Sequence, residues 1–176
     1  INKEVVMEYN HNETLETIRS WINNCDTKVS FALTFEVFLL GFIFSNDNLK
    51  NLTEIKKEIN LYSIILLVSF LITMMFLLFA LVHFYKTLKA NTNFEGNYPN
   101  MKSVLYYGSI SDGDFNHFRQ NVNNLDIYKL NQDYLMQIHI NSVICQKKFD
   151  NYNKGLKYLF ISLIPLVIYF VISIFK

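Results

Sequence analysis

The residue with the clearest chemical meaning is Glu36, a single carboxylate inside an otherwise apolar stretch, residues 29–44. An ionisable side chain inside a bilayer costs about 2.5 kcal/mol or more and normally faces a bundle interior or water. Glu36 could therefore line a pore or contact another subunit. The alternative is a structural carboxyl near the bilayer edge, protonated or satisfied by a neighbour. Lys28, on the same helix face, could neutralise it only by reaching about 12 Å along the axis.

Two further groups of residues could bind a ligand or take part in gating. Asp26 and Lys28 lie where the first apolar helix would enter the membrane, so they could pair with a cytoplasmic module; an ordinary interfacial charge pair is the alternative. Tyr106, Tyr107 and Gly108 place two rings beside a flexible backbone, which would suit stacking on a nucleobase. A membrane-interface belt and ordinary core packing explain the same rings.

Three cations could meet a phosphate group if their helices face one another: Arg119, Lys147 and Lys148. Lys147 and Lys148 also fit the excess of positive charge expected on the cytoplasmic side of a membrane protein, without any ligand.

Catalytic and metal-binding motifs are missing from the sequence. It contains no GxSxG, HExxH or P-loop, and the four histidines form no local ligand set. Cys25 and Cys145 stand alone and are expected to be small core residues. Sixteen Lys and Arg nearly balance fifteen Asp and Glu, so no nucleic-acid partner is indicated. We therefore expect a protein that is not an enzyme and holds no metal and no resident cofactor.

The elements that carry these residues are long apolar helices. The 176 residues, a single domain by length, are 51% hydrophobic and 18% charged, with only five Gly and two Pro. Three apolar runs have the length or the composition expected of membrane spans: residues 29–44, 61–84 and 158–175. The sequence predicts an all-α integral membrane protein with three transmembrane helices and a helical cytoplasmic module at 85–157.

The distribution of positive charge predicts the orientation. Lys and Arg number three in residues 1–28, three in 45–60 and nine in 85–157. The positive-inside rule therefore places 1–28 and 85–157 in the cytoplasm, and the 45–60 loop and the C-terminus outside.

Two heptad seams predict that the outer spans continue into cytoplasmic stalks. The first comprises Leu15, Ile18, Ile22, Cys25, Val29, Ala32 and Glu36, and the second Leu135, Ile138, Ser142, Cys145, Phe149, Tyr152, Leu156 and Leu159. Polar and small residues weaken both seams, which would suit helices that rearrange. The alternative is that the seams simply hold one subunit together. Between the stalks we expect an irregular stretch at about 91–113, then a helix capped by Asp112 or Asp114.

The ordered set of these features resembles a known family. The stretches TIRSWINNCDTKVSFALTF, YYGSIS and DYLMQIHINSVICQKKFDNYNKGLKYLFISLIPL are similar to the Pycsar transmembrane effector (PycTM) domain family of bacterial antiphage defence, from about residue 14 to the end. The sharpest matches are Asp26-Thr27-Lys28, Tyr106-Tyr107-Gly108, Gln137-Ile138, Ser142 and Lys148-Phe149.

This resemblance implies a function. A nucleotide cyclase responds to infection, its cyclic nucleotide activates the effector, and the spans rearrange or form a homo-oligomer that impairs the inner membrane. The infected cell then stops growing before phage matures, as in abortive infection. The alternatives are a membrane-anchored scaffold that binds a cytosolic partner protein, and a small channel.

Overall fold

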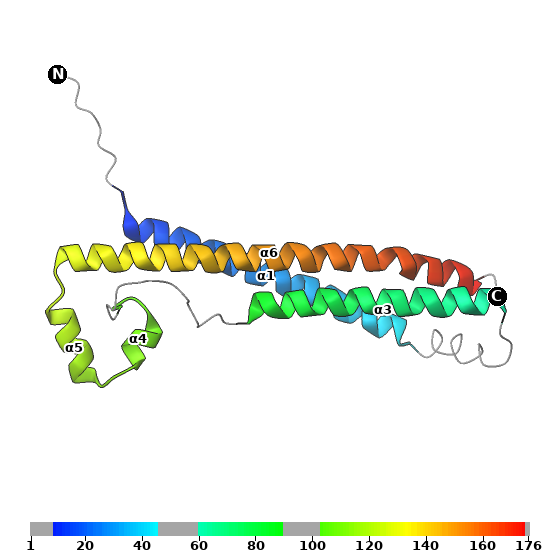
Figure 1. The fold of residues 1–176 in the computed structure, drawn as a ribbon, viewed down its shortest axis with the longest axis horizontal. Coiled ribbons are helices and arrows are strands. Elements are labelled where there is room, and N and C mark those ends of the chain that lie inside the picture. The colour runs from blue at the N-terminus through cyan, green and yellow to red at the C-terminus, as the bar shows by residue number, and fades with distance from the viewer. Residues whose placement is uncertain (1–8, 46–59, 90–102, 175–176) are drawn as a thin grey trace, which may run out of the picture. The chain divides into compact units, whose positions relative to one another are not determined.

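The computed structural model describes residues 9–45, 60–89 and 103–174, and this part of the chain is helical without strands. Its helices are α1 (His11–Ile43), α3 (Leu61–Leu88), α4 (Tyr107–Ser111), α5 (Phe115–Asn123) and α6 (Ile127–Ile174) (Figure 1). The predicted all-α class is confirmed. Most of the predicted 45–60 loop and the first part of the predicted irregular stretch lie outside the described residues.

Local sequence explains where two of the helices begin. The Asn60 side chain accepts a hydrogen bond of 2.9 Å from the Ser63 amide and so caps α3, which has no Gly or Pro. Asp114 caps α5 in the same way, through a 2.8 Å bond from the His117 amide. Of the two predicted caps, Asp112 and Asp114, the structure selects the second. The predicted irregular stretch also contains the short helix α4.

The chain divides into two compact units. Residues Ile1–Asn23 and Ala90–Gln146 form the first, which we call the loop unit, and Asn24–Lys89 and Lys147–Lys176 form the second, which we call the bundle unit. Helices α1 and α6 each begin in the loop unit and end in the bundle unit, so two continuous helices connect the units.

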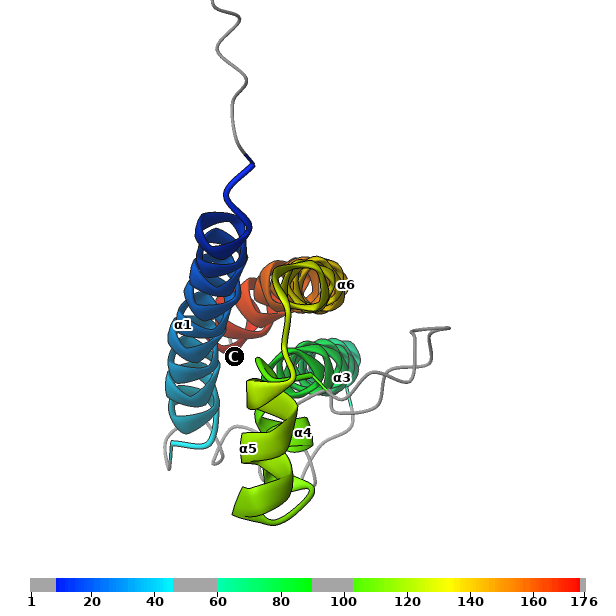
Figure 2. The ribbon, with the colours of Figure 1, turned by 90° about the vertical axis from the view of Figure 1, so that its left-hand side faces the viewer.

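Three helical segments form the bundle unit, and they lie side by side in two perpendicular views (Figures 1 and 2). Its core consists of apolar side chains from all three segments: Val29, Leu39, Ile43, Leu77, Ala80, Phe84, Leu159 and Leu166. Gly155 of α6 lies directly against the Phe84 ring, since a Cβ atom there would come within 2.6 Å of the ring. This glycine therefore allows α3 and α6 to approach each other closely.

The number of membrane spans differs from the prediction. Two helices of the described chain are long and apolar enough to cross a bilayer, Leu61–Leu88 and Ile127–Ser173, whereas three were predicted. The final 18 residues of α1, 26–43, include Asp26, Lys28 and Glu36. These three charges explain why α1 does not qualify by composition, although it packs with the other two helices.

The two predicted seams fare differently. On α1, five of the seven seam residues are buried: Leu15, Ile18, Cys25, Val29 and Glu36. At the start of α6 the predicted seam is wrong, because Leu135 is 42% exposed while Asp133 and Gln137 are buried instead. Polar contacts within the loop unit turn that face of the helix inward, as described below.

Candidate functional site

The central polar contact of the bundle unit joins all three of its helices. The Lys148 ammonium of α6 donates to the Asp26 carboxylate of α1 at 2.5 Å and to the Thr87 carbonyl of α3 at 2.7 Å. We call these three residues the clasp. The Lys148 side chain is 13% exposed and that of Asp26 is 36% exposed. The clasp thus brings together two residues for which the sequence predicted separate roles, gating for Asp26 and ligand binding for Lys148.

The end of α3 explains why a cation is placed here. Thr87 lies in the last turn of α3, where backbone carbonyls have no partner within the helix and the helix dipole is negative. Lys148 supplies the missing donor, while Asp26 balances its charge. The predicted gating residue Lys28 is exposed and takes no part in the clasp.

A second contact, between α3 and α6, lies one turn from the clasp. His83 Nδ1 is 3.1 Å from the Asn151 side-chain oxygen, and the His83 ring stacks on Tyr158 with centroids 5.6 Å apart. Polar and aromatic contacts therefore hold this end of the bundle unit, and a cluster of apolar side chains lies in its core.

Glu36 lies inside the bundle unit. Its side chain is 1% exposed, and neither carboxylate oxygen has a hydrogen-bond partner among the described residues. Sequence reasoning placed this carboxylate toward the bundle interior or water, and the structure places it in the interior.

The loop unit contains a buried polar network that sequence reasoning missed. Asp133 accepts a 2.8 Å hydrogen bond from the Val104 amide, and Gln137 donates to the Ser103 hydroxyl oxygen at 3.2 Å. The same Ser103 oxygen accepts the amides of residues 105 and 106, each at 3.1 Å. Asp133 and Gln137 are four residues apart on α6, so their spacing was the available signal. This network positions the segment before α4.

That segment leads directly to the predicted stacking platform. The rings of Tyr106 and Tyr107 lie 4.8 Å apart, and the Tyr106 ring covers Gly108 so closely that a side chain at this position would collide with it. Burial, and then the Tyr107 hydroxyl, raise the pKa of Tyr106 above its ordinary value. Tyr107 is 67% exposed. The structure therefore uses Tyr106 for local packing and leaves the Tyr107 ring accessible.

The three cations predicted to meet a phosphate are not gathered within either unit. Arg119 belongs to the loop unit, where its guanidinium lies 6.0 Å from the centre of the Phe115 ring. Lys147 and Lys148 belong to the bundle unit, and Lys148 is engaged in the clasp. Their role in ligand binding stays a prediction. The described chain also contains no group of three or more His, Cys, Asp or Glu that could hold a metal ion.

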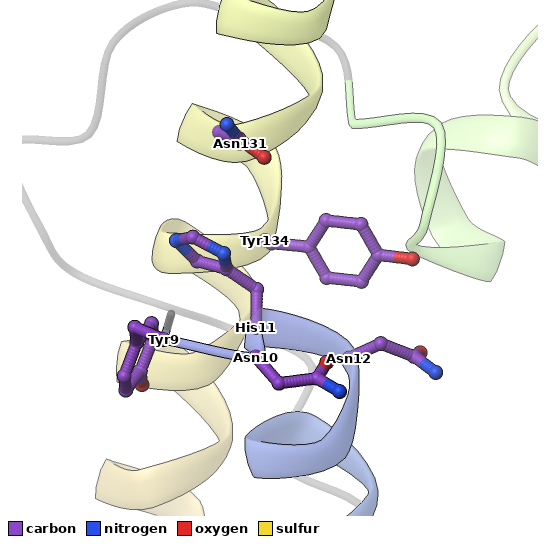
Figure 3. Close-up of a pocket in the computed structure, with 6 residues that line it drawn as sticks. All are labelled: Tyr9, Asn10, His11, Asn12, Asn131 and Tyr134. Atoms are coloured by element: carbon purple, nitrogen blue, oxygen red, sulfur yellow. The ribbon is translucent and has the colours of Figure 1, made fainter. Parts of the chain in front are cut away.

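A hollow on the loop unit is lined by amides and rings from the beginning of α1 and from α6 (Figure 3). It encloses about 340 Å³, and its lining residues are Tyr9, Asn10, His11, Asn12, Asn131 and Tyr134. The His11 ring meets Tyr9 edge-on, with ring centroids 4.8 Å apart, and is tilted by 40° to the Tyr134 ring, with centroids 6.3 Å apart. This combination of amides and aromatic rings can accept a planar, hydrogen-bonding ligand.

Long apolar helices around buried polar contacts define a helical membrane protein. More specifically, the chain belongs to the Pycsar effector protein domain family (PycTM), whose family model matches residues 10–175. It is similar to the Pycsar effector protein GmPycTM of Gulbenkiania mobilis, with 36% identity over 174 residues, 89% of this chain and 87% of that protein. No solved structure matches the chain. The predicted resemblance is confirmed, and this membership implies an antiphage-defence effector coupled to a cyclase and cyclic nucleotide signalling.

Proposed function

We propose that this protein is a membrane effector that binds a cyclic nucleotide on its loop unit and then impairs the integrity of the inner membrane of an infected cell. The continuity of α1 and α6 through both units carries this proposal. A ligand that moves α1 and α6 in the loop unit acts on the same two helices that pack together in the bundle unit. The ligand can shift the two states only by its differential affinity for them.

The surface of the bundle unit supports a membrane location for all three of its helical segments. The outward face of α1 beyond Lys28 carries large apolar side chains that are 45–73% exposed: Phe31, Phe35, Val37, Phe38 and Phe42. A helix that is apolar on both its packed face and its outer face is typical of a membrane environment. We therefore propose that α1 crosses the bilayer with α3 and α6, with the N-terminus and residues 85–157 in the cytoplasm and the C-terminus outside.

A homo-oligomer is part of the proposal. Three helices packed around one another leave no room for a continuous aqueous path, since a cluster of apolar side chains from all three occupies much of their shared core. Several copies of the chain, each with three spans, are needed to surround such a path. Because the described residues of one bundle unit supply a single buried carboxylate, Glu36, a ring of such groups also requires several chains.

For the ligand site, the hollow of Figure 3 is the best candidate on the described loop unit. Its rings can stack on a nucleobase, and its amides can both donate to and accept from the polar edge of that base. Tyr107 is the second candidate, because its exposed ring lies on the segment that the Asp133 network holds.

The experiment that tests ligand binding is a thermal unfolding panel of the full chain in detergent with cyclic mono- and dinucleotides. A ligand at 100 times its dissociation constant stabilises the folded state by about 2.7 kcal/mol. We expect one nucleotide to raise the melting temperature and Tyr134→Ala to abolish the rise. Tyr128→Ala is the matched control, since Tyr128 lies on the same helix, is 72% exposed and does not line the hollow. No shift with any nucleotide would contradict direct binding.

Membrane action is tested separately, in cells that express the protein together with a source of the active nucleotide. We expect loss of membrane potential and growth arrest only when both are present. An unchanged potential would refute the proposed effect on the membrane.

A scaffold role is the second candidate, and one observation favours it. The loop unit exposes several large apolar side chains, including Phe115 at 71%, Ile127 at 80% and Tyr128 at 72%. Exposed apolar groups of this kind suit a protein contact. Specific crosslinking of one cytosolic protein to these positions, together with no response to any nucleotide, would support this candidate over the first.

A further inference from the structure

Glu36 has a burial that packing does not explain. It is 1% exposed, and both of its carboxylate oxygens are without partners within the described residues. Enclosing an ionisable group without a hydrogen bond is costly, and an apolar residue of similar volume would fill the same space without that cost. Intramembrane carboxylates are typically found on ion pathways. The position therefore calls for a function beyond holding the bundle together.

The two helices that face α1 contribute buried hydroxyl groups. Ser162 of α6 is 0% exposed, and Thr73 and Ser69 of α3 are 1% and 5% exposed. Each hydroxyl donates to a carbonyl of its own helix, at 2.6 Å for Ser162, 2.8 Å for Thr73 and 3.0 Å for Ser69. Their hydrogens are thus used within the helices, and what remains for other groups is oxygen lone pairs.

Interpolation between two contacts puts Glu36 and Ser162 at about the same level of the bundle unit. The clasp joins α1 to α6 at one end, and the Phe42 and Phe170 rings, 5.0 Å apart, join them at the other. Glu36 is ten residues after the clasp aspartate and six before Phe42. Ser162 is fourteen residues after the clasp lysine and eight before Phe170. Each residue lies a little under two-thirds of the way from the clasp to the ring contact along its own helix, so we place the two at about the same level along the bundle.

The same comparison places Thr73 close to this level. On α3 the clasp carbonyl and Phe70, whose ring is 6.4 Å from that of Phe44, mark the two ends. Interpolation between them sets Glu36 beside Leu77, which is one turn from Thr73. We call Glu36, Ser162 and Thr73 the oxygen layer, because all three are buried and offer oxygen atoms from three different helical segments.

A proline adds a fourth source of oxygen at the same level. Pro165 lies within α6 and has no amide hydrogen to give to the carbonyl of Ile161, four residues earlier and adjacent to Ser162. Proline is tolerated in a membrane helix where other groups satisfy the carbonyl that it leaves. The layer therefore combines one carboxylate, two hydroxyl oxygens and a backbone carbonyl, which is the ligand chemistry of hard cations.

We propose that the oxygen layer binds a monovalent cation in the closed bundle, and that its carboxylate, Glu36, forms the selective position of the path that opens when the bundle helices separate. This inference rests on the proposed membrane-impairing function and adds its permeant class: cations such as K⁺ and Na⁺ pass, and anions are excluded. Each chain of an oligomer supplies one carboxylate, so the chains together present a ring of negative charge, as in cation channels.

The test is a current measurement on the full chain in planar bilayers of phosphatidylethanolamine and phosphatidylglycerol under a KCl gradient, with each cyclic nucleotide of the panel added. We expect wild-type protein and Glu36→Asp to prefer K⁺ over Cl⁻, and Glu36→Gln to lower the permeability ratio by about tenfold. Glu16→Gln is the matched control, since it makes the same change on α1 at an exposed position. We expect it to leave the ratio unchanged.

Two results overturn the inference, and they differ in what they say about the proposed function. Currents that persist in Glu36→Gln with an unchanged ratio, or that prefer Cl⁻ in the wild type, refute the cation site alone and leave membrane impairment intact. The absence of current from every variant with every nucleotide refutes both. We expect a melting temperature of Glu36→Gln at or above that of the wild type, which would confirm that the variant is folded, because the substitution replaces a buried ionisable group with a neutral one of the same shape.

Discussion

The clasp provides the sharpest quantitative prediction. Replacing Lys148 with Met keeps most of the length of the side chain and removes both of its charge-assisted hydrogen bonds, to Asp26 and to the Thr87 carbonyl. Hydrogen bonds to charged groups contribute about 1.5–3 kcal/mol each. Water can rehydrate Asp26, which is 36% exposed, but Thr87 is fully buried. We therefore expect Lys148→Met to lower the free energy of unfolding by about 3 kcal/mol.

The partner variant separates the two bonds. In Asp26→Asn the lysine keeps its bond to the carbonyl, so only the ion pair is lost. Because this pair is partly exposed, its loss is expected to cost about 1 kcal/mol. The double variant should be no less stable than Lys148→Met alone, since the lysine change already breaks the pair. The double-mutant cycle then gives a coupling energy of about 1 kcal/mol.

Thermal unfolding in detergent without nucleotide measures these differences. For a chain of this length, 1 kcal/mol corresponds to roughly 2–4 °C, so Lys148→Met should melt about 6–12 °C below the wild type. Lys147→Met is the matched control, because Lys147 is the preceding residue and its side chain is exposed. An exchange of charges, Asp26→Lys with Lys148→Asp, should not restore stability, because a carboxylate would then face the Thr87 carbonyl.

The reasoning about the clasp is refuted by either of two results: a Lys148→Met variant as stable as the Lys147→Met control, or purely additive effects in the cycle. Full rescue by the charge exchange would show that the carbonyl of α3 contributes nothing.

Two further predictions concern packing and the loop unit. Gly155→Ala should destabilise the bundle unit by about 1–3 kcal/mol, because its methyl group meets the Phe84 ring, whereas Gly41→Ala, with open space around it, should be neutral or stabilising by up to about 1 kcal/mol in the same melting assay. Equal effects of the two would contradict the close approach of α3 and α6. Asp133→Ala removes the acceptor of the Val104 amide and should speed its hydrogen exchange by about tenfold, as measured by mass spectrometry. Unchanged exchange there would mean that other contacts hold the segment.

The sequence predicted the helical architecture well, because helix formation and burial depend on local patterns. The uninterrupted apolar run of α3, the seam of α1 and the cap at Asp114 are each visible within a few residues. The position of Glu36 toward the bundle interior or water was predicted because an ionisable side chain that faces lipid costs free energy. These features depend on periodicity and on the chemistry of single residues, both of which a sequence displays.

Contacts between distant segments were not predicted, because no local pattern specifies them. The clasp joins residues 61 and 122 positions apart, and the Ser103–Gln137 bond spans 34. The wrong seam at the start of α6 has the same cause. Leu135 is apolar and by its residue type would be expected at a buried position. Asp133 and Gln137 are buried instead, because they form hydrogen bonds with a segment about 30 residues away, and these bonds set the rotation of the helix.

The polar interior of the bundle unit also sets the energy scale of the proposed switch. Moving a two-state equilibrium from 1:99 to 99:1 requires about 5.5 kcal/mol of differential binding energy. A clasp of about 3 kcal/mol favours the closed bundle, and an enclosed carboxylate costing about 2.5 kcal/mol disfavours it. Under the proposed function, these two contributions are comparable and opposite, so together they add little to the stability of the closed state. An all-apolar bundle would lack both contributions, and with them the polar contacts on which the proposed switch can act.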